Sequence, residues 1–222
     1  MFRTYLVLFF SIFNYGLFAQ PLTNFTAPAN YTRIMELKGD LDKDGVEEMV
    51  YVYNTNKPDG QLGFFRVLYI CKASAGKLQL WKENATVIRS SKDCGLCFET
   101  DITLELSVKN SAMVIKQTFF NSSKHSSINK NVFRYQNRDW FMIGSTFTDN
   151  YVCGWTYKYD VNFSTKQVSI ADTFEDCEEV KVIPKDKFST FKYPFTAVPK
   201  MDGYRPGIVE LKAPGSKKSF YY

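Results

Sequence analysis

Apolar and polar side chains alternate along many short stretches of this chain, and turn-forming residues separate these stretches. The segment 49–53 reads Met-Val-Tyr-Val-Tyr, and β-branched and aromatic residues of this kind pack well on a pleated, half-buried surface. Runs of about four to eight such residues between turn signals predict strands. The predicted strands are 31–38, 48–54, 63–72, 77–82, 102–108, 112–120, 131–136, 139–145, 154–161 and 167–171.

The residues between these runs indicate hairpins. Asn137-Arg138 separates two predicted strands and fits a tight primed turn at Asn137, which short antiparallel hairpins prefer. No window shows apolar residues repeated at helical spacing. The pattern therefore predicts an all-β fold with little helix. We expect an antiparallel meander of hairpins, arranged as a β-sandwich or as a partial propeller-like assembly of sheets.

The first residues have the order of a secretory signal peptide. Arg3 lies near the start, an apolar run fills most of 6–18, and the small residue Ala19 follows, as in the charged, apolar and cleavage regions of such peptides. We predict a signal peptide at 1–19, cleaved after Ala19, and an exported protein in the periplasm or outside the cell. The apolar run is shorter than the roughly 20 residues of a spanning helix, and we expect no transmembrane segment in the mature chain.

The remaining length fits one domain. About 200 residues are enough for a single large all-β domain with a real core. We predict a β domain over 20–172, followed over 173–222 by strands and loops that pack on the same domain. This last part is rich in Lys and Pro, and its predicted strands lie near 180–183 and 207–211.

Charge excludes one class of partner. The formal net charge is +5 and basic residues are scattered along the chain, without the basic face of a nucleic-acid binder. We therefore expect no nucleic-acid partner. The expected partner is a protein or a glycan, and charge does not identify it.

Five cysteines follow the signal peptide, and disulfides are expected in an oxidising compartment. Cys153 and Cys177 flank the predicted hairpin centred near 162–165, so they can pair across it. Cys94 and Cys97 pair with each other, or one of them pairs with Cys71. The odd count leaves one thiol free or intermolecular.

The strongest chemical signal is the stretch 39–48, Gly-Asp-Leu-Asp-Lys-Asp-Gly-Val-Glu-Glu. Carboxylates occupy loop positions 1, 3, 5 and 9, and alternate side chains of a tightly turning loop point at one centre. Ca²⁺ is a hard cation that takes six to eight oxygen ligands, and Gly45 permits the sharp bend. The sequence therefore predicts a calcium site formed by Asp40, Asp42, Asp44 and Glu48 together with the backbone carbonyl of Val46.

This loop does not have the features of an EF-hand. An EF-hand needs a bidentate Glu at loop position 12 and flanking helices, whereas position 12 is Tyr51 and both flanks are strand-like. We interpret the stretch as a calcium loop within a β-hairpin. The alternative is a solvated acidic turn without metal.

The loop and its flanks resemble the integrin-type FG-GAP or VCBS repeat loop, in which Asp-rich hairpins of secreted β proteins bind Ca²⁺. Over 35–170 the chain is similar to exported proteins of the Bacteroidetes type that carry one such loop. The matching features are 39–53, Leu80-Trp81-Lys82 and 132–144. The resemblance implies Asp40, Asp42, Asp44 and Glu48 as metal ligands, and it implies no catalytic activity.

Catalytic and redox residues give weaker signals. His125 is the only histidine, and it lies in the polar run 121–129, which is typical of an exposed loop. Cys94-x-x-Cys97 favours a structural disulfide, because a redox-active thiol of this kind needs a helix N-terminus and the surroundings look like a loop between strands.

Sugar-directed chemistry stays an alternative. Carboxylate pairs such as Glu99/Asp101 or Glu178/Glu179 would serve a glycosidase only at a defined spatial separation. Trp140 and Trp155 can stack on sugars, although aromatic residues in strands more often pack in the core. We favour an exported, non-enzymatic calcium-binding module that acts at the surface or in the periplasm. A secreted hydrolase directed at glycans, with paired carboxylates as acid and base, is the alternative.

Overall fold

The computed structural model describes residues 23–74, 76–99, 102–177 and 182–222. The predicted signal peptide and its cleavage site lie outside these residues. The described chain is almost entirely strand and turn, and its one helical element is the short 3₁₀ turn η1 (Gly60–Leu62). The predicted all-β fold class is confirmed.

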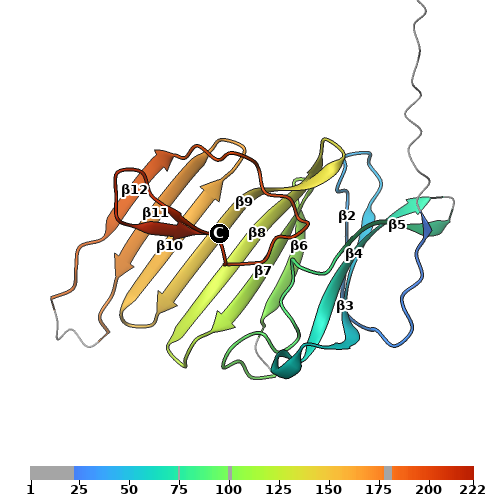
Figure 1. The fold of residues 1–222 in the computed structure, drawn as a ribbon, viewed down its shortest axis with the longest axis horizontal. Coiled ribbons are helices and arrows are strands. Elements are labelled where there is room, and N and C mark those ends of the chain that lie inside the picture. Colours follow the sequence, from blue (N-terminus) through green and yellow to red (C-terminus); the bar gives the residue numbers. More distant parts are fainter. Residues whose placement is uncertain (1–22, 75, 100–101, 178–181) are drawn as a thin grey trace, which may run out of the picture.

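Two antiparallel sheets make up most of the fold (Figure 1). The smaller sheet contains β1 (Thr23–Asn24), β2 (Thr32–Gly39), β3 (Glu48–Pro58), β4 (Phe64–Ser74) and β5 (Lys77–Asn84). The larger sheet contains β6 (Leu104–Lys109), β7 (Ala112–Phe120), β8 (His125–Gln136), β9 (Asp139–Tyr151), β10 (Trp155–Asn162), β11 (Gln167–Phe174) and β12 (Lys187–Lys192). The strand orders are β1-β5-β4-β3-β2 and β12-β11-β10-β9-β8-β7-β6, so nearly every strand pairs with its neighbour in sequence, as in a meander of hairpins.

A short C-terminal hairpin covers the larger sheet. It consists of β13 (Glu210–Lys212) and β14 (Ser219–Tyr221), and Figure 1 shows this red segment crossing one face of the larger sheet. Phe220 is fully buried there and belongs to the main core. Met201 and Tyr204 of the same C-terminal part also belong to this core.

The main core lies between the facing surfaces of the sheets, the C-terminal segment and the connection from β5 to β6. In β3, Val50 and Val52 point into this core, while Tyr51 and Tyr53 point into a second cluster on the other face. Period-two alternation explains this division, because successive side chains of a strand project to opposite faces. The smaller sheet therefore buries apolar side chains on both faces, and Phe25 packs against the outer one.

The two sheets meet where β2 runs beside β6. A Cβ atom on Gly39 would lie 2.6 Å from the Val108 side chain, so only glycine fits this close approach. This contact fixes the end of β2 against the larger sheet, and the acidic loop begins at the next residue. The junction of the sheets therefore positions the loop.

Tight turns follow the predicted chemistry. Asn137 and Arg138 have φ of 50° and 64°, which is the positive-φ pair of a type I′ turn. Asn110 and Ser111, with φ of 52° and 53°, make the same turn between β6 and β7. The tight turn predicted at Asn137 is confirmed.

Three predicted elements need correction. The strand expected at 180–183 is wrong for Val182 and Ile183, which are exposed and outside any strand, while 180 and 181 lie outside the described residues. The edge strand is β12 instead, and its charged ends are typical of sheet edges. The strand expected at 207–211 is displaced to β13, which pairs with β14.

The run 121–129, expected as an exposed loop, is a strand from His125 onward. The loop was predicted from the polar composition of this run, and the prediction is wrong because some of these polar side chains are buried in a strand. Asn129 is 1% exposed, and it lies opposite Phe147 on β9. This segment pairs with β7 on one side and with β9 on the other, and this pairing makes it a strand although its own sequence does not predict one.

Disulfides link Cys153 to Cys177 and Cys94 to Cys97. The first pair closes across the β10–β11 hairpin as predicted, and the second resolves the alternatives left open for the other three cysteines. Two disulfides indicate an oxidising, exported location. No helix of the described chain is both long and apolar enough to span a bilayer.

The remaining thiol, Cys71, is fully buried in β4, and burial raises its pKa to about 12. Because the thiolate is the reactive form, we expect a colorimetric thiol reagent to find essentially no reactive thiol in the native protein at neutral pH. Denaturation without reductant should expose one thiol per chain. Rapid reaction of the native protein, or three thiols after denaturation, would contradict this assignment.

Candidate functional site

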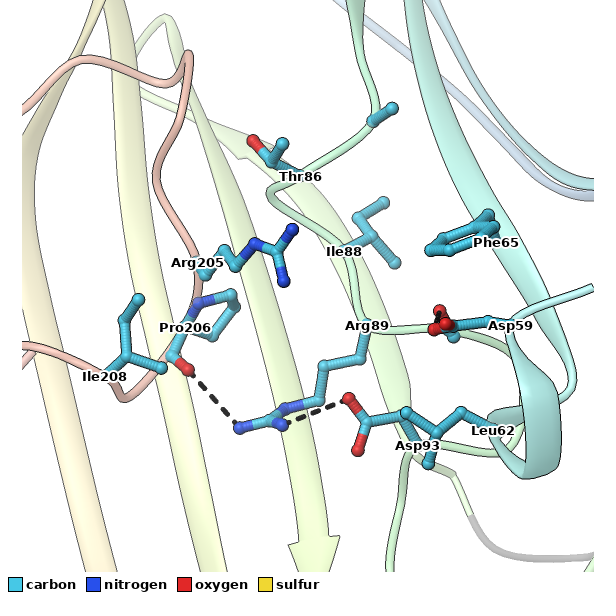
Figure 2. A pocket seen from close by; sticks show the side chains of 12 residues that line it. Asp59, Leu62, Phe65, Thr86, Ile88, Arg89, Asp93, Arg205, Pro206 and Ile208 are labelled. Carbon is cyan, nitrogen blue, oxygen red and sulfur yellow. Dashed lines mark hydrogen bonds and ion pairs between the residues drawn. The ribbon is translucent and has the colours of Figure 1, made fainter.

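A pocket opens between the smaller sheet, the β5–β6 connection and the C-terminal segment (Figure 2). Its volume is about 200 Å³, and Leu62, Phe65 and Ile208 form much of its apolar wall. Its charged groups are Asp59, Asp93 and two arginines. The pocket is therefore mixed in character, with acidic and basic groups in equal number.

Two of the pocket's acids already have partners. Asp93 pairs with the Arg89 guanidinium at 3.3 Å, and the Ser90 hydroxyl donates to Asp59 at 2.7 Å. Arg89 also donates to the carbonyl of Pro206, at 3.4 Å. Arg205 points its guanidinium into the pocket in Figure 2.

The aromatic residues considered for sugar stacking are occupied. Trp140 is 2% exposed. Trp155 stacks between two tyrosines, with ring centroids 5.9 Å from Tyr151 and 4.5 Å from Tyr157. Trp140 is therefore closed to a sugar, and the Trp155 ring is already engaged in stacking.

His125 pairs with a carboxylate, and its Nε2 lies 2.7 Å from Asp149 Oδ1. Its ring also contacts Trp155, at 5.3 Å between centroids. These contacts hold the histidine on the sheet, and no hydrogen bond joins it to a serine, threonine or cysteine side chain of the described residues. Of the paired carboxylates named above, Asp101, Glu178 and Glu179 lie outside the described residues.

The Cys94-x-x-Cys97 segment lies in the connection between strands. Phe120 donates its backbone N–H to the carbonyl of Cys94 at 2.9 Å, and Leu96 donates to the carbonyl of Phe120 at 2.8 Å. These bonds attach the segment to the end of β7. The disulfide therefore pins a loop to the larger sheet, and its cysteines are not at a helix N-terminus.

The acidic loop connects β2 to β3, and its ends are held together. Gly39 and Glu48 are register partners at the ends of these strands. Leu41 is 1% exposed and anchors the loop in the main core. Gly45, with φ of 83°, makes the bend that the sequence predicted. The acidic loop thus has the expected strands on both sides.

Carboxylate side chains accept hydrogen bonds from backbone N–H groups of this loop. Asp40 accepts hydrogen bonds from the N–H groups of Lys43, at 2.6 Å, and Gly45, at 3.2 Å. Glu48 Oε2 accepts from the Leu41 N–H at 2.7 Å. These bonds tie the beginning of the loop to its end, so both ends present oxygen atoms to the same place.

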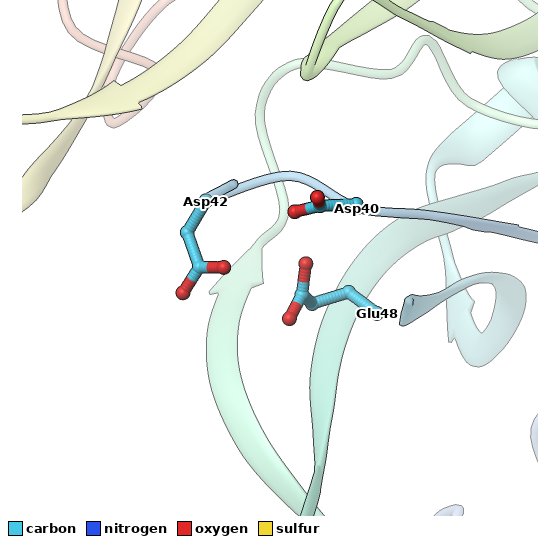
Figure 3. A group of neighbouring side chains, drawn as sticks. All are labelled: Asp40, Asp42 and Glu48. Carbon is cyan, nitrogen blue, oxygen red and sulfur yellow. The ribbon is translucent and has the colours of Figure 1, made fainter. Parts of the chain in front are cut away.

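Three of the predicted ligands come together. Ligand oxygens of Asp40, Asp42 and Glu48 all lie within 4.8 Å of one another, and Figure 3 shows the three carboxylates facing a common space. Carboxylate oxygens are the ligands that Ca²⁺ prefers. We call these three residues the acidic group. In the described part of the chain, no other cluster of three or more His, Cys, Asp and Glu side chains has the spacing that could hold a metal ion.

The fourth predicted carboxylate, Asp44, is placed differently. Asp44 is exposed, is not part of the acidic group, and accepts a hydrogen bond from the Val46 N–H at 2.8 Å. It shapes the turn in this structure. The role of the Val46 carbonyl as a ligand stays a prediction.

Glu48 is the buried member of the acidic group, with 1% of its side chain exposed. Burial raises its pKa, and the Leu41 hydrogen bond opposes this effect. Its Oε1 accepts no hydrogen bond from the described residues. Burying a carboxylate whose oxygen has no hydrogen-bond partner costs free energy unless a cation lies nearby. For Glu48 this cation can be a bound metal ion or a lysine.

Lys72 of β4 is the residue that sequence reasoning missed. Its ammonium donates to Asp42 Oδ2 and lies 4.0 Å from Glu48 Oε1. Burial alone lowers the pKa of this ammonium, but the hydrogen bond and charge of Asp42 outweigh burial, and the pKa is raised. The three carboxylates outnumber this one ammonium, so Lys72 balances only part of the charge of the group.

No protein-family model, curated protein sequence or solved structure matches this chain. The assignment of the site therefore depends on its own geometry and chemistry. The resemblance to the FG-GAP or VCBS loop stays an expectation from the sequence.

Proposed function

We propose that this chain is an exported calcium-binding β protein without catalytic activity, and that it acts as a binding or interaction module. One Ca²⁺ ion is held by Asp40, Asp42 and Glu48. The observation that carries the proposal is the convergence of these three carboxylates from the two ends of one hairpin loop. The ion completes its shell with water or loop carbonyls, since Ca²⁺ takes six to eight oxygens.

The proposed role of the ion is to hold the junction of the two sheets. The loop begins at the close contact between Gly39 and Val108, and it ends at the buried Glu48 of β3. Without a cation, the carboxylates repel one another and the buried one loses its hydration. A bound ion therefore stabilises the folded chain, because it binds the native state and not the unfolded one.

The partner-binding part of the proposal is supported by the surface near the pocket. Leu62, Phe65 and Ile208 line the pocket, and each is more than 40% exposed. Exposed apolar side chains grouped at a concavity are typical of interaction sites. A protein or glycan partner at this surface is consistent with a module that binds and does not catalyse.

The direct test compares thermal unfolding in calcium and in a chelator. At calcium about 100-fold above the dissociation constant, binding stabilises by about 2.7 kcal/mol, which raises the melting temperature by roughly 5–10 °C for a domain of this size. Magnesium should give a smaller shift, because it prefers strict octahedral geometry and keeps its waters. Identical melting in calcium and in chelator contradicts the proposal.

A glycan-directed hydrolase stays the alternative, and the pocket is where it would act, since Asp59 and Asp93 both line it. Both carboxylates already have partners, Arg89 for Asp93 and the Ser90 hydroxyl for Asp59, and a substrate would have to compete with them. Hydrolysis of a polysaccharide that is lost in Asp59→Asn and Asp93→Asn variants, but kept in a Glu48→Gln variant, would favour the hydrolase.

A further inference from the structure

Lys72 enters the acidic group through strand pairing. Met49 of β3 lies opposite Cys71 of β4, so the residues next to them, Glu48 and Lys72, come together at the end of the β3–β4 hairpin. The lysine side chain is 24% exposed and the Glu48 side chain is 1% exposed. The fold therefore places the Lys72 ammonium near Glu48, the only buried carboxylate of the acidic group.

An aromatic ring holds the same ammonium from another direction. The Lys72 Nζ lies 4.1 Å from the centre of the Trp81 ring, which is within the range of a cation–π contact. Trp81 in turn packs against Trp140 and Tyr135, with centroids 5.1 Å and 4.5 Å away. The Lys72 ammonium therefore has defined partners, and its position depends on the Trp81 indole.

The ammonium and a metal ion need the same oxygen. Lys72 donates to Asp42 Oδ2, and Asp42 is one of the three carboxylates that converge. A divalent ion among these oxygens would lie close to the ammonium, and two cations in a partly buried place repel strongly. Both cannot occupy the acidic group at once.

We propose that Lys72 is the counter-ion of the acidic group in the absence of calcium, and that calcium binds by displacing its ammonium from Asp42. This inference rests on the proposed function. Lys72 then sets the calcium affinity, because each binding event must break its contacts with Asp42 and Trp81. It also keeps the loop folded when calcium is scarce, since it neutralises part of the charge of the group.

The test is a calorimetric calcium titration of the wild type, Lys72→Met and Lys82→Met. The control is matched, because Lys82 also forms an ion pair on the smaller sheet, with Asp202, and its loss changes the net charge equally. We expect Lys72→Met to bind calcium at least about tenfold more tightly, while Lys82→Met stays close to the wild type. In chelator, Lys72→Met should melt below the wild type, and calcium should restore it.

A second measurement uses the intact wild-type lysine. Calcium should change the tryptophan fluorescence of the wild type, because the ammonium leaves the Trp81 ring, and a Trp81→Phe variant should lose this change. If the wild type binds calcium but Lys72→Met shows the same affinity, or the fluorescence does not respond, the displacement idea is wrong and the calcium site stands. If neither protein binds calcium, the proposed function fails as well. Binding by Lys72→Met alone would mean that calcium does not displace the ammonium in the wild type, and it would overturn both the displacement and the proposed function.

Discussion

Replacing Asp42 and Glu48 by their amides is expected to lower the calcium affinity by at least about 100-fold, which is roughly 2.8 kcal/mol. The change removes two of the three converging charges, and calcium affinity depends on the number of charged ligands. Calorimetric titration of the Asp42→Asn, Glu48→Gln double variant measures the loss directly.

The fold should survive this change. Glutamine at position 48 still offers an acceptor to the Leu41 N–H, and burial disfavours the charge of Glu48, as its raised pKa shows. A group whose pKa is higher in the folded state weakens stability once it is ionised. Removing that charge therefore offsets part of the disturbance in the metal-free protein, and far-ultraviolet circular dichroism would verify the fold.

Asp44→Asn is the matched control, because Asp44 lies outside the acidic group. We expect it to keep most of the calcium affinity, since its carboxylate accepts a hydrogen bond from Val46 that an amide oxygen can also accept. Equal loss in the control and in the double variant would contradict the ligand set of the structure. It would favour the set predicted from sequence spacing.

Trp140→Ala is expected to reduce the free energy of unfolding by about 3–5 kcal/mol, the usual cost of emptying a large aromatic site. The indole is 2% exposed and packs against Trp81 and Tyr135. The backbone carbonyl of Trp140 accepts the Met201 N–H at 2.9 Å, so this site also attaches the C-terminal segment. Urea unfolding followed by circular dichroism measures the change.

Phe188→Ala provides the comparison for this loss. Phe188 is 71% exposed on β12, and surface substitutions usually change stability by less than about 0.5 kcal/mol. A Trp140→Ala loss no larger than that of Phe188→Ala would mean that the C-terminal segment and the β8–β9 hairpin do not share a core at this point.

Local patterns predicted most of the strands. The alternation in β3 and the Asn137 turn are both properties of a few adjacent residues, and the structure confirms both. The C-terminal hairpin has a weaker local signal, because its strands are three residues each, and its first strand was expected at 207–211 instead of 210–212. Burial of Phe220 against the larger sheet is what orders it.

The candidate site was partly predictable for the same reason. Asp40, Asp42 and Glu48 are close in sequence, so their convergence follows from loop spacing and from the bend at Gly45. The exposure of Asp44 depends on the turn of its own backbone, where its side chain bonds the Val46 N–H. Spacing alone does not reveal that turn.

Lys72 could not be found from the loop, because it lies on another strand. Its position follows from the register of β3 with β4, in which Met49 faces Cys71. Apolar alternation indicates that two strands exist and which side chains share a face, but it does not fix this register to the residue. The counter-ion of the site is therefore a property of tertiary structure.

The most direct measurement is the crystal structure of the mature chain grown with calcium. We predict one ion bound by oxygens of Asp40, Asp42 and Glu48 at about 2.3–2.6 Å, with an anomalous signal that identifies calcium and with the Lys72 ammonium turned away from Asp42. A structure at saturating calcium in which no ion is bound and Lys72 still contacts Asp42 would contradict the account.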